Sequence, residues 1–237
     1  MRIAVQLKHT VSAQPSPDDT FQYERLARAQ GYARIAGVDE AGRGPLAGPV
    51  VAACVILPAD CEFSVFKDSK QLSARQRERL FHLLQNNNAV IGVGSATAHE
   101  IERINILQAS LLAMKRAVQG CLPQGSVVLP DFLLVDGTFN VPLPLAQLTL
   151  TKGERRSASI AAASIIAKVS RDRIMAGMHE RFPQYGFHQH QGYPTKAHRE
   201  TIRRFGPCPE HRRTFRGVRE FLPAAEQPVL TDQLVLW

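Results

Sequence analysis

The stretch RIAGVDEAGRGPLAGPVVAACVIL, residues 34–57, contains two apolar runs with acidic and glycine residues between them. Residues 34–38 and residues 49–57 are apolar and rich in β-formers, so each run predicts a buried strand. Asp39 and Glu40 stand at the end of the first run. They are followed at once by the basic, glycine-broken loop Gly42-Arg43-Gly44-Pro45. Two negative charges between buried strands need a function that packing alone does not provide.

Composition sets the class of protein before any motif is considered. The chain has 237 residues, 44% of them hydrophobic and 21% charged, which is typical of a globular protein with one large domain. A formal net charge of +8 favours a polyanionic partner, with nucleic acid first and an unspecialised basic surface as the alternative. No apolar run approaches the roughly 20 residues of a membrane span. The four cysteines show no CxxC spacing, so we expect reduced thiols in a cytoplasmic protein.

The rest of the chain alternates helical and strand patterns. Beyond the opening stretch, strands are predicted at residues 89–97, 131–137 and 145–150. The predicted helices are residues 21–31, a helix opened by a Ser73–Gln76 capping box and running to Leu84, a pair between about 98 and 119, an alanine-rich helix at 157–182, and 195–206. This order predicts an α/β fold with a mixed central sheet.

Three acids, Asp39, Glu40 and Asp136, follow predicted strands, where an α/β sheet presents side chains to a cleft. In a regular strand Asp39 and Glu40 point to opposite faces, so they share a site only if the chain leaves the pleat, which the following glycines favour. Clustered carboxylates repel one another unless cations lie among them, and all-oxygen sites select Mg²⁺ or Mn²⁺. Two such ions can clamp the attacking and leaving oxygens of a phosphodiester. For Asp136, followed by glycine, a simple turn is the alternative.

The segment GVDEAGRGPLAGPVVAACVIL resembles the signature of the type 2 ribonucleases H, and specifically that of bacterial ribonuclease HII. Further blocks agree in the family's order and extend the resemblance over roughly residues 32–220. These blocks are DSKQLS, LLVDG, TKGERRSASIAAASIIAKVSRDRIM, FPQYGFHQHQGYPTKAH and GPCPEHRRTF. Several long blocks in the right order are far more specific than one short motif.

The resemblance implies a ribonuclease H-like fold with a small helical C-terminal region. Residues 31–222 form the catalytic domain in this interpretation, after a peripheral extension at 1–30 and before a flexible tail at 223–237. The implied activity is metal-dependent cleavage of RNA paired with DNA, including a cut 5′ of a single ribonucleotide in duplex DNA that leaves 3′-hydroxyl and 5′-phosphate ends. Such an enzyme serves ribonucleotide removal in DNA replication and repair.

The resemblance also assigns the acids. Asp39, Glu40 and Asp136 match metal ligands of the family. The fourth acid usually stands in Lys-Gly-Asp, whereas this chain has Lys152-Gly153-Glu154. Glu154 therefore takes the fourth place with a side chain one methylene longer, and its alternative is a solvated surface charge.

Substrate contacts follow from the same blocks. RNA is told from DNA through its 2′-hydroxyl, and glycines let the backbone approach a sugar closely. We carry the family's ribonucleotide contact over to Gly42, Arg43 and Gly44, for which a tight turn is the alternative. Tyr193 matches a tyrosine that stacks on the sugar at the RNA-to-DNA junction, although a tyrosine before proline also suits simple packing.

Lys70, Lys168 and Arg171 are candidate phosphate contacts, with a solvated surface position as the alternative for each. A zinc site is disfavoured because no cysteine spacing accompanies the histidines. These histidines are His188, His190, His198 and His211.

The last five residues resemble the Gln-Leu-x-Leu-Phe peptide with which bacterial replication proteins dock on the sliding clamp. Here Gln233, Leu234, Leu236 and Trp237 take those places, with Trp for Phe. A tail folded on the core is the alternative. Two other functions remain open: a related nuclease such as a junction resolvase, and a nucleic-acid binding module without catalysis. We expect a monomer.

Overall fold

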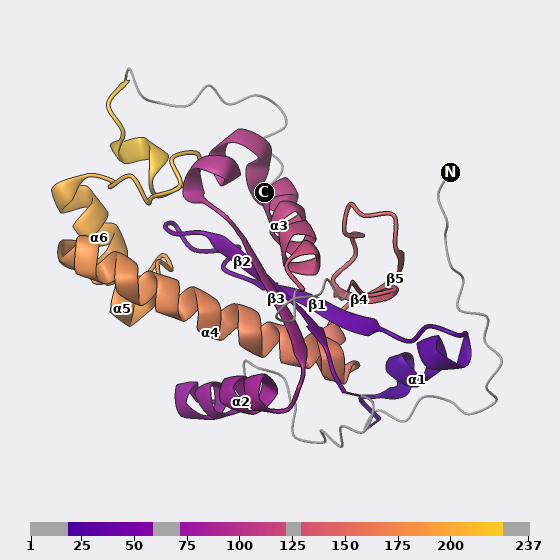
Figure 1. Cartoon of the computed structure of the whole chain (residues 1–237). Helices are drawn as coiled ribbons and strands as arrows, with labels where there is room; N and C mark the ends of the chain where they lie inside the picture. Colours follow the sequence, from indigo (N-terminus) through magenta and orange to yellow (C-terminus); the bar gives the residue numbers. More distant parts are fainter. Residues whose placement is uncertain (1–18, 59–71, 122–128, 225–237) are drawn as a thin grey trace.

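The computed structural model describes residues 19–58, 72–121 and 129–224, and a five-stranded sheet with the order β3-β2-β1-β4-β5 forms its centre (Figure 1). The strands are β1 (Ile35–Ala41), β2 (Val50–Ile56), β3 (Val90–Ala96), β4 (Phe132–Asp136) and β5 (Ala146–Leu150). β1, β2 and β3 pair antiparallel, whereas β1, β4 and β5 pair parallel. The predicted α/β fold with a mixed sheet is therefore confirmed.

Helices cover both faces of the sheet. α3 (Ala98–Gln119) packs on one face over β2 and β3, and α4 (Ala158–Arg181) with α2 (Ala74–Asn86) packs on the other (Figure 1). A Cβ on Gly37 of β1 would lie 2.0 Å from the Ser159 carbonyl carbon, so the α4 backbone rests directly on this strand. The small residues of α4 thus serve the close packing that the sequence predicts.

Local signals place most of the helix ends. Ser73 and Gln76 form the predicted capping box of α2. Within α3, Asn105 has a non-helical backbone with φ of 62° and accepts a hydrogen bond from the Gln108 amide, so the predicted pair of helices is one element with a break at its junction. α1 (Gln22–Ala29) docks through the buried Glu24, whose carboxylate accepts a hydrogen bond from the Ser157 hydroxyl at 2.6 Å.

The C-terminal part of the described chain is short and helical, as predicted. It comprises α5 (Phe187–His190), α6 (Lys196–Phe205) and the 3-10 turns η3 (Pro183–Tyr185) and η4 (Arg219–Phe221). Ile202 of α6 packs against Leu46 and Val218, which ties this region to the loop after β1. Lys70 and the tail residues 233–237 lie outside the described residues, and the domain boundaries at 30 and 222 stay predictions. In the described ranges, no helix combines the length and apolarity needed to cross a bilayer.

Candidate active site

The sheet brings the first acids together through strand register. The last parallel pair between β1 and β4 is Val38 with Val135, so Asp39 and Asp136 are the next residues on adjacent strands. β1 itself continues to Ala41, further than the predicted end at residue 38, because β2 still pairs with its other edge. The expected departure from the pleat at these acids is therefore wrong, because Asp39 and Glu40 stay paired with β2 and the chain leaves the strand only at Gly42. Both acids lie beside the end of β4, and the charge of Glu40 still acts on Asp39.

Glu154 reaches the same place from the turn after β5. It lies on η2 (Gly153–Arg155), and the preceding Lys152 adopts the left-handed conformation with φ of 56°. The Gly153 amide donates a hydrogen bond of 2.7 Å to Asp136 Oδ1, which fixes the turn to β4. Glu154 is 7% exposed and accepts a hydrogen bond of 3.3 Å from the Ser164 hydroxyl of α4. The alternative of a solvated surface charge is therefore wrong.

Burial and repulsion by neighbouring carboxylates perturb Asp39 and Glu40. Burial, followed by the charges of Glu40, Asp136 and Glu154, raises the pKa of Asp39 well above its ordinary value. Burial also raises the pKa of Glu40, although Arg43 at 3.4 Å opposes this shift. The like charges act on one another through a desolvated region, so a bound cation would lower the free energy of the ionised cluster.

The donor chemistry fits a hard divalent ion because all four acids offer oxygen. Each acid is held by a local donor, as in the hydrogen bond of 2.7 Å from the Glu40 amide to Asp39 Oδ1. Among the residues that the structure describes, no three His, Cys, Asp or Glu side chains are grouped to hold one ion as they stand. The four acids thus form an electrostatic cluster, and their side chains would have to move closer together to share an ion.

The loop after β1 is held by Arg212, a buried arginine that was not among the predicted site residues. Gly42 adopts φ of 96°, where the chain leaves the strand. The fully buried Arg212 donates hydrogen bonds to the carbonyls of Gly42, Arg43 and Gly48 at 2.5, 2.8 and 3.0 Å. Burial lowers the pKa of Arg212 to about 9. This guanidinium therefore clamps the loop backbone at Gly42, Arg43 and Gly48, on both sides of Gly44.

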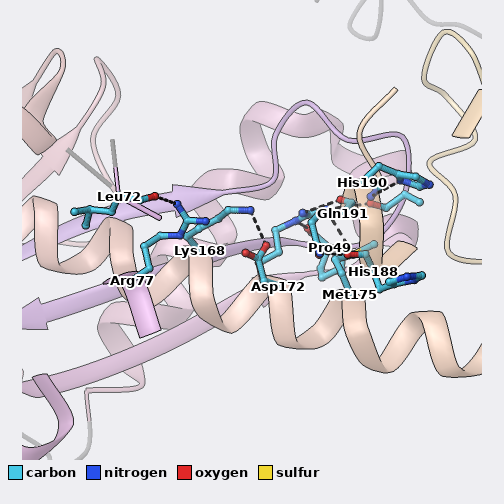
Figure 2. Close-up of polar contacts among 12 residues, drawn as sticks. Pro49, Leu72, Arg77, Lys168, Asp172, Met175, His188, His190 and Gln191 are labelled. Carbon is cyan, nitrogen blue, oxygen red and sulfur yellow. Dashed lines mark hydrogen bonds and ion pairs between the residues drawn. The ribbon is translucent and has the colours of Figure 1, made fainter. Parts of the chain in front are cut away.

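Arg171 of α4 also donates hydrogen bonds to carbonyls of this loop. Its guanidinium donates to the carbonyls of Pro49, Gln191 and Ala47 at 3.0, 3.0 and 3.2 Å. The residue is 1% exposed, and burial lowers its pKa. The predicted phosphate contact by Arg171 is thereby corrected, because its donors face protein carbonyls inside the molecule. Lys168, one turn earlier, is half-buried and pairs with Asp172 at 2.6 Å (Figure 2).

Tyr193 lies over the loop. A Cβ on Gly44 would meet only the Tyr193 ring within 4 Å, at 3.8 Å from Cε1, and the tyrosine is 43% exposed. The Leu46 amide donates to the Gly192 carbonyl at 2.8 Å, which ties the two segments together. Tyr193 is thus too exposed for simple core packing.

Two buried histidines, His198 and His211, support the backbone at Tyr193 through hydrogen bonds. The His198 Nδ1 lies 3.0 Å from the Tyr193 carbonyl, so this nitrogen must donate. The Cys208 amide donates to His211 Nδ1, which leaves the proton of His211 on Nε2, 3.1 Å from His198 Nε2. Both rings are therefore neutral, and burial lowers the pKa of His198 to about 4 and that of His211 to about 3. His190 stacks on His198 and donates to the Tyr185 carbonyl.

Arg212 and this histidine pair belong to segments quoted for the resemblance, but their spacing carries no signal of a clamp. The carbonyl partners of Arg212 lie in the loop after β1, 164 to 170 residues earlier. His198, in contrast, contacts Tyr193 five residues before it and His211 thirteen residues after it. Only the folded chain shows these contacts.

Comparison with known proteins identifies the family. The family model described as Ribonuclease HII matches residues 36–218. The chain belongs to the ribonuclease HII family. A relative named Ribonuclease HII from Desulfotalea psychrophila is 56% identical over 211 residues, covering 89% of this chain and 93% of its own. The chain is therefore a ribonuclease H, a metal-dependent hydrolase that acts on RNA–DNA hybrids.

Solved structures agree on the fold. The crystal structure of the ribonuclease H2 from Pyrococcus horikoshii has a TM-score of 0.64 and 27% identity, covering 80% of this chain and 97% of that one. The structure of the PCNA:RNase HII complex from Archaeoglobus fulgidus also has a TM-score of 0.64, with 24% identity and coverage of 76% and 94%. The predicted ribonuclease H-like fold is confirmed.

Proposed function

We propose that this ribonuclease H cuts the RNA strand of hybrids and also cuts 5′ of a single ribonucleotide embedded in duplex DNA. The products are a 3′-hydroxyl and a 5′-phosphate, and the role is ribonucleotide removal in replication and repair. One observation carries the proposal: an exposed tyrosine ring and an open glycine face each other beside the buried acids. A sugar that enters there exposes its 2′-hydroxyl to the loop backbone and its adjacent phosphate to the acids.

Each group has a distinct task in this proposal. Asp39, Glu40, Asp136 and Glu154 would hold Mg²⁺ or Mn²⁺ through their carboxylate oxygens. Such ions supply a water of lowered pKa and neutralise charge on the phosphate. The backbone of Gly42, Arg43 and Gly44 would read the 2′-hydroxyl, held in place by the clamp of Arg212.

Tyr193 would place its ring on the sugar at the RNA-to-DNA junction. Lys168 would contact a backbone phosphate by exchanging its ion pair with Asp172 for the phosphate. Lys70 would make a similar contact, although it lies outside the described residues.

The test is cleavage of an end-labelled DNA duplex with one ribonucleotide, with and without Mg²⁺ and again with Mn²⁺. An all-DNA duplex and an all-DNA four-way junction are the controls. We expect one metal-dependent cut 5′ of the ribonucleotide and none in either control. Cleavage of the junction, or a cut without the 2′-hydroxyl, would contradict the proposal and favour a resolvase.

A clamp partner is the second part of the proposal. The Archaeoglobus protein in the structure named above is a ribonuclease HII in complex with PCNA. Residues 233–237 of this chain resemble the Gln-Leu-x-Leu-Phe peptide of bacterial clamp-binding proteins, with Gln233, Leu234, Leu236 and Trp237 as the contacts in this proposal. We expect deletion of these residues to abolish binding to a bacterial sliding clamp while cleavage of short duplexes persists. Equal clamp binding by the deleted chain would refute this part. A cytoplasmic location and a monomeric state stay predictions.

A further inference from the structure

A hollow lined by arginines lies on the C-terminal region, outside the acid cluster. It measures about 590 Å³ and is formed by α6 together with the turn around η4. α6 lies beside the C-terminal end of α4 in Figure 1, away from α1. The residues that line the hollow are Arg199, Arg203, Arg216, Gly217, Glu220 and Phe221.

The charge of this hollow is not balanced from within. Arg199, Arg203 and Arg216 are exposed, and in the described ranges no ion pair joins any of them to a carboxylate. Glu220 lies in the same lining, with its Oε1 3.6 Å from Arg219 and its Oε2 accepting from the Gly217 amide, so it offsets only one of the three guanidinium charges. Three guanidinium groups that surround one hollow attract an anion that their planar donors can chelate.

The elements that form the hollow pack against the loop that faces Tyr193. Leu46, two residues after Gly44, packs against Ile202 of α6 and against Val218, which lies between Arg216 and Glu220. Leu46 Cδ1 lies 3.6 Å from the position of a Cβ on Gly217. The same apolar contact therefore supports the loop and the floor of the hollow, so their separation is fixed.

We infer that this hollow binds a backbone phosphate of the substrate duplex, at a fixed distance along the nucleic acid from the ribonucleotide. The inference rests on the proposed function only in placing the ribonucleotide at the loop. The arginines chelate the phosphodiester, and the Phe221 ring offers an apolar wall to the neighbouring sugar. A phosphate contact contributes affinity without reading the base or the 2′-hydroxyl. The hollow thus anchors duplexes with and without ribonucleotides equally.

The decisive measurement is duplex binding by fluorescence anisotropy over a range of salt concentrations, without divalent ions. Arg203→Gln and Arg216→Gln remove charges that line the hollow. Arg204→Gln is the matched control, because Arg204 is the exposed neighbour on α6 whose guanidinium lies over Phe205, outside the hollow. We expect each of the first two variants to weaken binding roughly three- to tenfold and to reduce the salt slope by about one. The loss is equal for all-DNA and ribonucleotide-containing duplexes.

Shortening the duplex locates the phosphate. Duplexes are trimmed one base pair at a time on either side of the ribonucleotide, and the deficit of Arg203→Gln disappears once the bound phosphate is removed. A deficit that Arg204→Gln shares equally, or one that no truncation removes, indicates diffuse charge and overturns the inference. Unchanged duplex binding also overturns it and leaves an acidic peptide as the ligand class.

Failure of the two proposals can be separated. If wild type shows this binding pattern but does not cut at the ribonucleotide, only the proposed function fails. If wild type cuts normally and Arg203→Gln behaves like Arg204→Gln, only the phosphate site fails.

Discussion

The acid cluster and the loop that faces Tyr193 lie side by side but are built in opposite ways. The acids occupy consecutive register positions of β1 and β4 and the turn after β5, so the sheet itself places them. The loop is held by Arg171 and Arg212. These arginines donate to carbonyls between Gly42 and Pro49, which lie 122 to 170 residues earlier in the sequence. Sheet register therefore places the acids, whereas two buried guanidinium groups fix the loop backbone that we propose contacts the sugar. Mutations in the acid cluster and mutations in the loop should therefore affect activity and stability differently.

Removal of one acid should give the largest effect. In Asp136→Asn we expect cleavage at a ribonucleotide to fall about 10³-fold, because the cluster loses a charge that the divalent ions require. The Asn oxygen can still accept from the Gly153 amide, so the melting temperature should stay the same or rise as repulsion on Asp39 is relieved. Single-turnover kinetics and thermal melts measure both. Glu180→Gln, at an exposed position of α4, is the control, and full Mg²⁺-dependent cleavage by Asp136→Asn would refute the acid assignment.

The neutral histidine His198 makes the stability of the folded protein depend on pH. The pKa of His198 falls from its ordinary 6.5 to about 4 in the folded protein, so only the unfolded chain takes up this proton between those values. Stability is therefore complete above pH 6.5 and lost as the pH falls toward 4, by about 3 kcal/mol from this group.

His198→Gln tests this directly, because Gln can donate to the Tyr193 carbonyl and accept from His211 without titrating in this range. We expect chemical denaturation of this variant to show a flatter pH profile between 4 and 6.5 than wild type. The difference between the two proteins cancels the opposite trend from Asp39, whose raised pKa favours the folded state as the pH falls. His99→Gln, at an exposed position, is the control. Parallel profiles for His198→Gln and wild type would contradict the assigned tautomers.

Two neighbouring glycines separate recognition from folding. A methyl group on Gly44 meets only the Tyr193 ring, at 3.8 Å, so Gly44→Ala should fold normally yet fill the space that the sugar needs. We expect kcat/KM on a ribonucleotide duplex to fall roughly 10- to 100-fold.

Gly42→Ala is the contrast, since φ is 96° there and its methyl would lie 2.0 Å from Arg171 Nε. This variant should lose about 1–3 kcal/mol of stability. Melting temperatures measured beside the kinetics distinguish the two outcomes. A Gly44→Ala enzyme with wild-type kinetics would exclude the loop as the sugar contact.

The acid cluster could be predicted from the sequence to a greater extent than the contacts that hold the loop. The strands, the capping box at Ser73 and the grouping of the acids were predictable because each depends on neighbours within a few residues or on a distinctive block, whereas the role of the acids as metal ligands stays a prediction. The clamp was not, because Arg171 resembles any basic residue on a helix until its carbonyl partners are known. The same holds for Arg212, whose burial depends on a loop at the other end of the chain. Burial of a charge is a property of tertiary structure that local pattern does not encode.

Arg212→Lys should weaken the clamp while keeping its charge. Lysine presents a compact ammonium instead of a planar fork, so it cannot satisfy all three carbonyls that Arg212 bonds. We expect a loss of about 2 kcal/mol in stability and roughly tenfold in kcat/KM at a ribonucleotide. Affinity for an all-DNA duplex should change less than twofold, which distinguishes loop misplacement from general unfolding. Arg213→Lys is the neighbouring control, and an equal loss of DNA affinity in Arg212→Lys would argue against a positioning role.

The smallest effect is expected for the substitution of Glu154 by aspartate, at the position where this chain departs from the usual Asp. Glu154→Asp keeps the charge but draws the carboxylate back by one methylene from the Ser164 hydroxyl, which now donates to it at 3.3 Å. We expect cleavage with Mg²⁺ to change less than about fivefold, because the turn at Gly153 stays bonded to Asp136 and the shorter acid suits the family's spacing. Glu154→Gln, which removes the charge at the same length, should lose about 10²-fold. Metal titrations of both variants with Mg²⁺ and Mn²⁺ would show whether length or charge governs the ion. If Glu154→Gln cleaves as well as Glu154→Asp, Glu154 belongs to the packing of α4 and the acid site comprises three residues.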